Sequence, residues 1–411
     1  MGGTGITGAQ VVDGSYRRAR AARAEKARCV AGGLFVGLAA FATLVFTPVA
    51  DAASGCRVEI ANTRPKQAFT DLQTAVTAVA PGGTLVVRGT CEGATLDKDL
   101  TIRGQSDPVL GAPTLDGGGL GSVLRISGAT TIIALNGLTV THGQAVYGGG
   151  IYNEGQVALK GSAVSDNTAS EGGGLYNTPG ASMTATDTSI SNNTADGNGG
   201  GGIYNNSGAT VKLRRSSGVV ANTSTQGYGG GINNASGAVI LQDNSVVTQN
   251  VASIAIGGGI FNAPDGSVTL SDRSSITENV TRGGGGGGIY NFGRVLLTGA
   301  SSIARNTAGN NGQGGGVFNS GGALTPNNGI VTLTNVSIIS GNSAVQGGGI
   351  YTVGGMVTLV NKAKIGANTA SAAGGGGGIF FRNEATLVNC IAGLNVLNNI
   401  AGGEPNDIAG M

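Results

Sequence analysis

The sequence contains no tryptophan and only one histidine, and charged residues make up 11% of it. So few charges exclude a protein whose surface consists mainly of solvated helices, because such helices carry charged outer faces. Thr, Ser, Asn and Gly supply the polar groups instead, which is typical of strands and tight turns. The composition therefore favours an all-β protein.

A basic surface is also missing from most of the chain. Six of the 24 basic residues and three of the 22 acidic residues lie in residues 1–52, so the remainder carries a net charge of −1. Proteins that bind nucleic acids need a clustered positive surface. We therefore expect no nucleic-acid partner.

Glycine is abundant, with 79 residues, and it is periodic. Three glycines, an aliphatic residue, an aromatic residue and Asn first occur at Gly148–Asn153, and later copies follow at intervals of 24 to 33 residues. Each copy is followed by a short alternating pattern, such as Val239–Leu241, and then by an aliphatic residue with Asn three positions later. A period of this size indicates stacked units. The asparagines of the last pattern are Asn167, Asn193, Asn222, Asn250, Asn279, Asn306, Asn342 and Asn368.

The repeats predict a right-handed, single-stranded parallel β-helix, which is a β-solenoid with three strands per coil and about 11–12 coils. We expect aliphatic side chains to stack inside, stacked asparagines to hydrogen-bond between coils, and Gly and Asn to occupy corners with φ > 0. Apolar residues at helical spacing within residues 66–80 predict a helix that caps the N-terminal end.

The N-terminus has the pattern of a secretory signal peptide. A basic stretch precedes an uncharged segment, Cys29–Phe46, and Ala50–Ala52 has the form of a cleavage site. The alternative is an uncleaved anchor, because about 18 apolar residues can span a bilayer. We expect a membrane contact only through this segment, and only if it is uncleaved. The predicted divisions are a signal peptide at 1–52, an N-terminal cap with irregular first coils at 53–140, and regular repeats with an end coil at 141–411.

Export would place the chain in an oxidising compartment, where disulfides persist. Three cysteines follow the predicted cleavage site, namely Cys56, Cys91 and Cys390. Cys56 and Cys91 both lie in the first segment, so we predict a disulfide between them. Cys390 is then left over, and whether it links two chains is open.

Two parts of the sequence resemble known families. The segment Asp71–Gly104 resembles the N-terminal cap of pectin-lyase-like right-handed parallel β-helix proteins. The repeats resemble those of polymorphic outer-membrane proteins, which pair Gly-Gly-aliphatic with Phe-x-x-Asn; here Gly149–Ile151 and Ile276–Asn279 match that spacing, with Ile or Val in place of Phe. The resemblance implies a β-helix, and it implies a polysaccharide lyase or glycoside hydrolase as an alternative function.

Catalytic residues do not stand out. The resemblance implies that hydrolases of this group use clustered aspartates with a His and Arg-x-Lys, and that lyases use Arg with carboxylates that bind Ca²⁺. His142 is the single histidine, and no such partners surround it in the sequence. We therefore assign no catalytic residue, and enzymatic activity stays uncertain.

Two aspartates suggest a cation site. Asp243 and Asp272 follow the alternating strand pattern at the same position in successive repeats, so their Cα atoms should lie about 5 Å apart. Such a pair could hold Ca²⁺. The alternative is a turn position that tolerates Asp, because Gly or Asn occupies it in other repeats. We expect no cofactor apart from this possible Ca²⁺ ion.

The residue after each repeat aliphatic forms an aromatic column. Strict alternation turns these side chains outward when the aliphatic residue points inward. An outward aromatic strip could bind sugar rings or a partner surface, or the rings could simply stack and cover the sheet. The column consists of Tyr152, Tyr176, Tyr204, Asn233, Phe261, Tyr290, Phe318, Tyr351 and Phe380.

These observations favour a secreted or cell-surface rod without enzymatic activity, which acts in adhesion, envelope structure or partner binding. A surface glycan or a component of the cell envelope is the expected partner. The oligomeric state is open.

Overall fold

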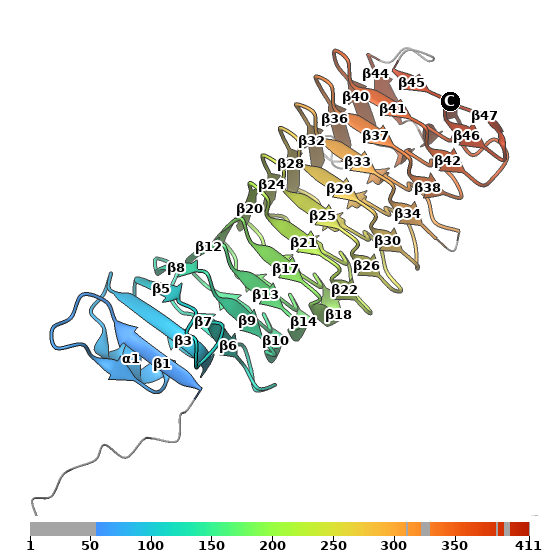
Figure 1. The fold of residues 1–411 in the computed structure, drawn as a ribbon. Coiled ribbons are helices and arrows are strands. Elements are labelled where there is room, and N and C mark those ends of the chain that lie inside the picture. Colours follow the sequence, from blue (N-terminus) through green and yellow to red (C-terminus); the bar gives the residue numbers. More distant parts are fainter. Residues whose placement is uncertain (1–54, 310, 322–328, 384, 390–394, 411) are drawn as a thin grey trace, which may run out of the picture. The chain divides into compact units, whose positions relative to one another are not determined.

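Each repeat forms one turn of a parallel β-solenoid in the computed structural model of the protein (Figure 1). About half of the chain is strand and about 2% is helix, in about 11 turns, so the predicted all-β solenoid is confirmed. The structure describes residues 55–309, 311–321, 329–383, 385–389 and 395–410, all within the unit Asp51–Met411.

Three sheets surround the solenoid interior, and the strands of successive coils pair in register. We call the three sheets sheet 1, sheet 2 and sheet 3, and sheet 2 is bent into two limbs, 2a and 2b. Within a coil the chain runs from the glycine triplet into sheet 1, then through limbs 2a and 2b, and then into sheet 3. The long strand β3 (Thr84–Glu92) joins the two limbs, because its two halves pair with different neighbours. From β7 (Leu124–Ile126) onward, each coil contributes four strands. The sequence pattern reveals three of them, because most strands of sheet 3 have two residues and bury only Ala, Ser or Thr.

The strands of sheet 1 are β4 (Ala94–Leu96), β7 (Leu124–Ile126), β11 (Ile151–Asn153), β15 (Leu175–Asn177), β19 (Ile203–Asn205), β23 (Ile232–Asn234), β27 (Ile260–Asn262), β31 (Ile289–Asn291), β35 (Val317–Ser320), β39 (Ile350–Val353), β43 (Ile379–Arg382) and β48 (Ile408–Ala409). Limb 2a contains β5 (Leu100–Gly104), β8 (Ile132–Asn136), β12 (Gln156–Lys160), β16 (Ser182–Thr186), β20 (Thr210–Arg214), β24 (Ala238–Leu241), β28 (Ser267–Leu270), β32 (Arg294–Leu297), β36 (Ile330–Leu333), β40 (Met356–Leu359) and β44 (Thr386–Val388).

Limb 2b contains β6 (Thr114–Asp116), β9 (Thr139–Thr141), β13 (Ala163–Ser165), β17 (Ser189–Ser191), β21 (Gly218–Val220), β25 (Val246–Thr248), β29 (Ser275–Thr277), β33 (Ser302–Ala304), β37 (Ile338–Ser340), β41 (Lys364–Gly366) and β45 (Val396–Leu397). Sheet 3 contains β10 (Gln144–Tyr147), β14 (Thr168–Glu171), β18 (Thr194–Gly199), β22 (Thr223–Ser224), β26 (Val251–Ala252), β30 (Val280–Thr281), β34 (Thr307–Ala308), β38 (Ser343–Ala344), β42 (Thr369–Ala370), β46 (Ile400–Ala401) and β47 (Glu404–Pro405).

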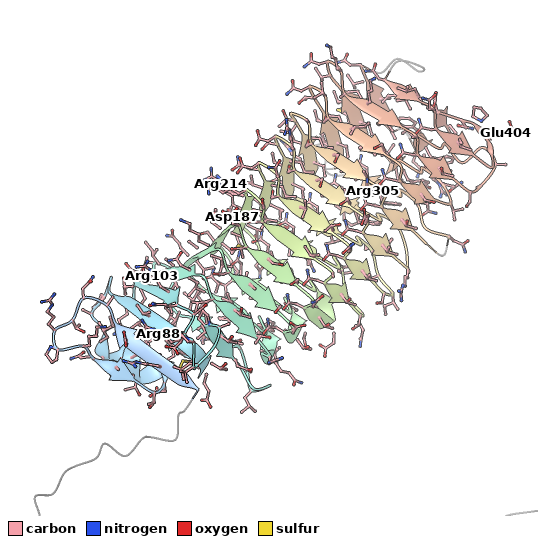
Figure 2. All side chains as sticks on the ribbon, in the orientation of Figure 1. Arg88, Arg103, Asp187, Arg214, Arg305 and Glu404 are labelled. Carbon is pink, nitrogen blue, oxygen red and sulfur yellow. A yellow bond between two sulfur atoms is a disulfide. The ribbon has the colours of Figure 1, made fainter. Side chains whose placement is uncertain are left out.

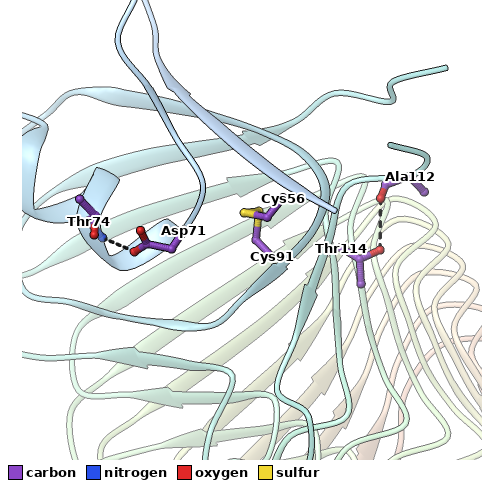
Figure 3. Close-up of a disulfide and its surroundings, with 6 residues drawn as sticks. All are labelled: Cys56, Asp71, Thr74, Cys91, Ala112 and Thr114. Atoms are coloured by element: carbon purple, nitrogen blue, oxygen red, sulfur yellow. Dashed lines mark hydrogen bonds between the residues drawn. A yellow bond between two sulfur atoms is a disulfide. The ribbon is translucent and has the colours of Figure 1, made fainter. Parts of the chain in front are cut away.

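A small cap covers the N-terminal end of the solenoid. Strand β1 (Cys56–Ile60) pairs antiparallel with β2 (Ala68–Phe69) and with β3. Helix α1 (Leu72–Ala78) buries its apolar face in the core, and the Asp71 side chain caps it by accepting a hydrogen bond from the Thr74 amide at 2.7 Å (Figure 3). The predicted helix is therefore present, and it is shorter than the sequence pattern suggests.

The glycine triplet allows close stacking of the coils, and each of its three positions requires glycine for a different reason. The first glycine has positive φ, as Gly229 does at 66°. A Cβ atom on the second, Gly230, would overlap the carbonyl oxygen of Gly258 in the next coil, and one on the third, Gly231, would lie 2.9 Å from the Asn250 side chain. The aliphatic residue after every triplet is fully buried.

Buried asparagines form a ladder at the turn between limb 2b and sheet 3. Asn250 Nδ2 donates to Oδ1 of Asn279 and to the carbonyl of Val219, both at 2.9 Å. Asn250 Oδ1 accepts from the backbone amide and from Nδ2 of Asn222, at 2.9 and 3.0 Å. The predicted hydrogen bonding between stacked asparagines is confirmed. The ladder contains the eight asparagines predicted from the sequence and then Asn399, and it ends on the carboxylate of Asp407.

A second ladder, on sheet 1, consists of Asn153, Asn177, Asn205, Asn234, Asn262, Asn291 and Asn319, and it ends on the hydroxyl of Thr352. All seven of these asparagines are fully buried.

The positive φ angle lies on the residue before each asparagine of the first ladder. It is 59° at Gln249 and at Glu278, and 54° at Ala221. The expectation that these asparagines themselves occupy corners with φ > 0 is wrong. The asparagine side chains point into the solenoid and form hydrogen bonds there. The residue before each of them, which is exposed or half-buried, adopts the left-handed conformation.

Replacement of one ladder asparagine should destabilise the protein. Asn250→Ala removes the acceptor of two Asn222 donors and the side-chain donor to Asn279, and an unsatisfied buried polar group costs about 1–3 kcal/mol. Chemical denaturation should therefore show a lower free energy of unfolding for Asn250→Ala. It should show little change for Asn244→Ala, which alters an exposed side chain of the same coil. Equal stability of the two variants would contradict a stabilising role of the ladder.

Candidate functional site

The outward aromatic residues of sheet 1 stack on one another from coil to coil, except at Asn233. Register pairs such as Tyr152 with Tyr176 place one ring of each coil over the next. The ring centroids of Tyr290 and Phe318 lie 4.3 Å apart, and those of Tyr351 and Phe380 lie 5.3 Å apart, with nearly parallel planes. The aromatic column predicted from the sequence is therefore a physical stack.

The column is interrupted at Asn233. Asn233 is buried and donates to the carbonyl of Asn198. Tyr228, from the loop before the glycine triplet, supplies a replacement ring that stacks on Phe261 at 4.7 Å. Tyr147 occupies the equivalent place in an earlier coil, where its ring lies 5.0 Å from that of Tyr176. The sequence pattern does not reveal either of these tyrosines.

The rings of the column differ in exposure. Tyr176 and Tyr351 are buried, while the other rings of the column remain half-buried. Burial, followed by the negative charge of Glu171, raises the pKa of Tyr176 to about 12, and burial likewise raises the pKa of Tyr290 to about 12. The rings thus cover the sheet by packing on one another, and they leave a partly exposed strip along its surface.

A cation lies at the N-terminal end of the aromatic column. Arg125 occupies the same outward position on β7, and its guanidinium lies 4.3 Å from the centre of the Tyr152 ring. Glu154 holds this guanidinium through an ion pair of 2.7 Å, and it also accepts the Gly128 amide at 3.0 Å. Arg125 is therefore fixed against the first ring of the column.

Beside Arg125 the surface is hollowed by a groove, which we call the N-terminal groove. A cleft of about 630 Å³ and an adjoining hollow of about 450 Å³ share Thr95, Ser122 and Arg125 in their walls. The rim carries exposed apolar side chains, among them Leu120 and Val146. The other lining residues that bear on function are Gln73, Glu92, Asp116, Tyr147 and Tyr152.

His142 has an acidic partner that the sequence did not reveal. Its Nδ1 atom lies 3.0 Å from Oδ2 of Asp116, which lines the groove, and Glu92 is the register partner of Asp116 on the neighbouring strand. The hydrogen bonds from His142 and from the Gly118 amide hold the pKa of Asp116 below its usual value. The sequence pattern does not reveal this contact, because the irregular first coils lack the repeat that shows which residues are stacked.

Asp243 and Asp272 lie on successive coils at the corner between limbs 2a and 2b, with φ of 60° and 59°. The Asp243 carboxylate accepts the Arg215 amide at 2.9 Å, and the Asp272 carboxylate accepts the Asp243 amide at 3.1 Å. Asp187, labelled in Figure 2, occupies this corner two coils before Asp243 and pairs with Arg215 at 3.4 Å. These contacts explain both aspartates as turn residues.

Metal binding at the two aspartates stays a prediction. Across the parts of the chain that the structure describes, no group of three or more His, Cys, Asp or Glu side chains is placed to hold a metal ion. A Ca²⁺ ion bound by these two aspartates would therefore need further oxygen ligands, such as backbone carbonyls or water.

Cys56 and Cys91 form a disulfide, as the sequence analysis proposes (Figure 3). It ties strand β1 of the cap to β3, and Cys91 also lines the N-terminal groove. Among the described residues, no helix has the length and apolar content needed to cross a membrane. The predicted signal peptide at 1–52 and Cys390 lie outside the described residues.

No family model, curated protein or solved structure matches the chain significantly. The geometry therefore defines the class of protein, which is a parallel β-solenoid with an N-terminal cap.

The contact between Asp116 and His142 predicts a pH dependence of stability. Because the pKa of Asp116 is lower in the folded than in the unfolded chain, its stabilising effect is present above the unfolded pKa of about 3.9 and is lost as pH falls through the folded value. The melting temperature of Asp116→Asn should lie below that of the wild type at pH 6. This difference in melting temperature should shrink below about pH 3.9. A constant difference across the pH range would contradict a stabilising contact between Asp116 and His142.

Proposed function

We propose that this protein is a secreted or cell-surface β-solenoid rod that binds a glycan of the cell envelope along sheet 1 without catalysing a reaction. The observation that carries the proposal is the aromatic column, which runs along the outer face of sheet 1 and reaches the N-terminal groove at Tyr152. Half-exposed aromatic rings can pack on the apolar faces of sugars. Repetition of the ring once per coil suits a ligand that is itself a polymer.

Export is supported by two observations. The sequence carries the pattern of a signal peptide, and the Cys56–Cys91 disulfide belongs to a class of bond that persists in oxidising compartments. A location outside the cytoplasm also brings sheet 1 into contact with envelope glycans.

The family relationship belongs to the same proposal. Helix α1 precedes the first coils, where the resemblance to pectin-lyase-like proteins places a cap. The Gly-Gly-aliphatic phrase forms sheet 1, and the Ile-x-x-Asn phrase forms the turn of the first ladder. Both arrangements support a relation to β-helix proteins with polymorphic outer-membrane protein repeats.

A glycan array tests the proposal. Wild-type protein should bind at least one class of envelope polysaccharide, and Tyr152→Ala should weaken that binding about two- to tenfold, because one stacking contact is lost. Tyr351→Ala is the matched control, since this ring belongs to the same column but is 2% exposed and cannot touch a ligand. A blank array for the wild type, or equal losses for both variants, would count against glycan binding along sheet 1.

A polysaccharide lyase or glycoside hydrolase is the second candidate. The observation that favours it is the contact of His142 with Asp116 beside a cleft that Glu92 also lines, since such groups can transfer protons. The assay is a panel of polysaccharides in which unsaturated products and new reducing ends are both measured. We expect no product; turnover that disappears in both His142→Ala and Asp116→Asn would establish the enzyme and contradict our proposal.

A further inference from the structure

The N-terminal groove carries negative charge that its own residues do not balance. Glu92 and Asp116 are neighbours on paired strands, and both line the cleft. Within the residues that the structure describes, no ion pair reaches Glu92, and Asp116 pairs with His142 alone, at 3.0 Å. The groove therefore offers two carboxylates to a cationic group.

Among the described residues that line the groove, Arg125 is the one cationic side chain, and it is already engaged. Arg125 is bound by Glu154 at 2.7 Å, and its guanidinium lies over the Tyr152 ring. An anionic ligand would compete with Glu154 for this guanidinium and would meet Glu92 and Asp116 in the same cleft. The local charges therefore favour a cation over a uronic acid or another anionic sugar.

Apolar surface adjoins these carboxylates. Tyr147 and Tyr152 line the adjoining hollow, and Tyr147 is 45% exposed. Leu120 and Val146 on the rim are 85% and 61% exposed, so their apolar surfaces are open to a ligand. A fitting ligand therefore combines cationic groups with flat apolar faces.

We propose that the N-terminal groove binds an amino sugar with a free, protonated amine, as found in a deacetylated glucosamine polymer. This inference rests on the proposed glycan-binding function and names the class of glycan. The ammonium group donates charge-assisted hydrogen bonds to Glu92 and Asp116, and these are stronger than bonds between neutral groups. The apolar face of an adjacent sugar unit packs on Tyr147 or Tyr152.

Calorimetry with three defined oligosaccharides tests this inference on the full-length protein. The probes are the hexamer of β-1,4-linked glucosamine, its fully N-acetylated counterpart and a hexamer of galacturonate, at a pH at which the free amine is protonated. We expect the glucosamine hexamer to bind at least about tenfold more tightly than the acetylated one, because acetylation removes a charged hydrogen-bond donor. Added salt should weaken this binding.

Variants locate the binding to the groove. Glu92→Gln and Asp116→Asn should each lower the affinity for the glucosamine hexamer about tenfold. Asp265→Asn is the matched control, because it neutralises an exposed carboxylate in a distant coil and should change nothing. Thermal unfolding of each variant checks that the fold is intact.

The outcomes separate this inference from the proposed function. Equal binding of the glucosamine and acetylated hexamers, with loss in Tyr152→Ala, would overturn the amino-sugar assignment and leave glycan binding in place. Preferred binding of galacturonate would overturn it in the same way. If none of the hexamers binds, the assignment is wrong, and the glycan array alone decides on the broader proposal.

Discussion

The structure depends on hydrogen bonding between the backbones of successive coils, which requires each coil to lie over the last at strand spacing, about 4.8 Å. In-register pairs such as Val239 with Val268 place like residues over like. At this separation a side chain at Gly230 has no room, because the next backbone already fills the space. The same separation lets stacked amides and stacked rings touch. The glycine triplets, ladders and aromatic column are thus consequences of one constraint.

The asparagine ladder shows how a polar interior is stabilised under this constraint. Each Nδ2 donates toward the next coil, so all the amides point in one direction, and hydrogen bonds aligned in this way polarise one another. Both ends of the series are satisfied. The Gly143 amide donates to Asn167 at the start, and the Asp407 carboxylate, which only accepts when ionised, receives two hydrogen bonds from Asn399 at the end.

The candidate site arises where the regular stacking begins. In the regular coils, neighbouring rings on sheet 1 and neighbouring backbones cover one another. Before Gly148, the loop at Gly117–Gly121 lies beside β10 without a matching loop in the next coil. The resulting groove collects Arg125, Glu92 and Asp116 beside exposed apolar side chains. Chemical diversity is thus concentrated where the repeat is absent.

The sequence alone determined the features that repeat. The period of the glycine phrase defines the coil, alternation defines which residues point inward, and equal spacing predicts the first ladder and the column from Tyr152 to Phe380, because residues at the same phase of a solenoid must stack. The tertiary structure decided what has no period. It placed Tyr228 opposite the gap at Asn233, moved positive φ to the neighbours of the asparagines, and brought His142 to Asp116. These contacts depend on the lengths of single loops, and a pattern of spacing carries no information about them.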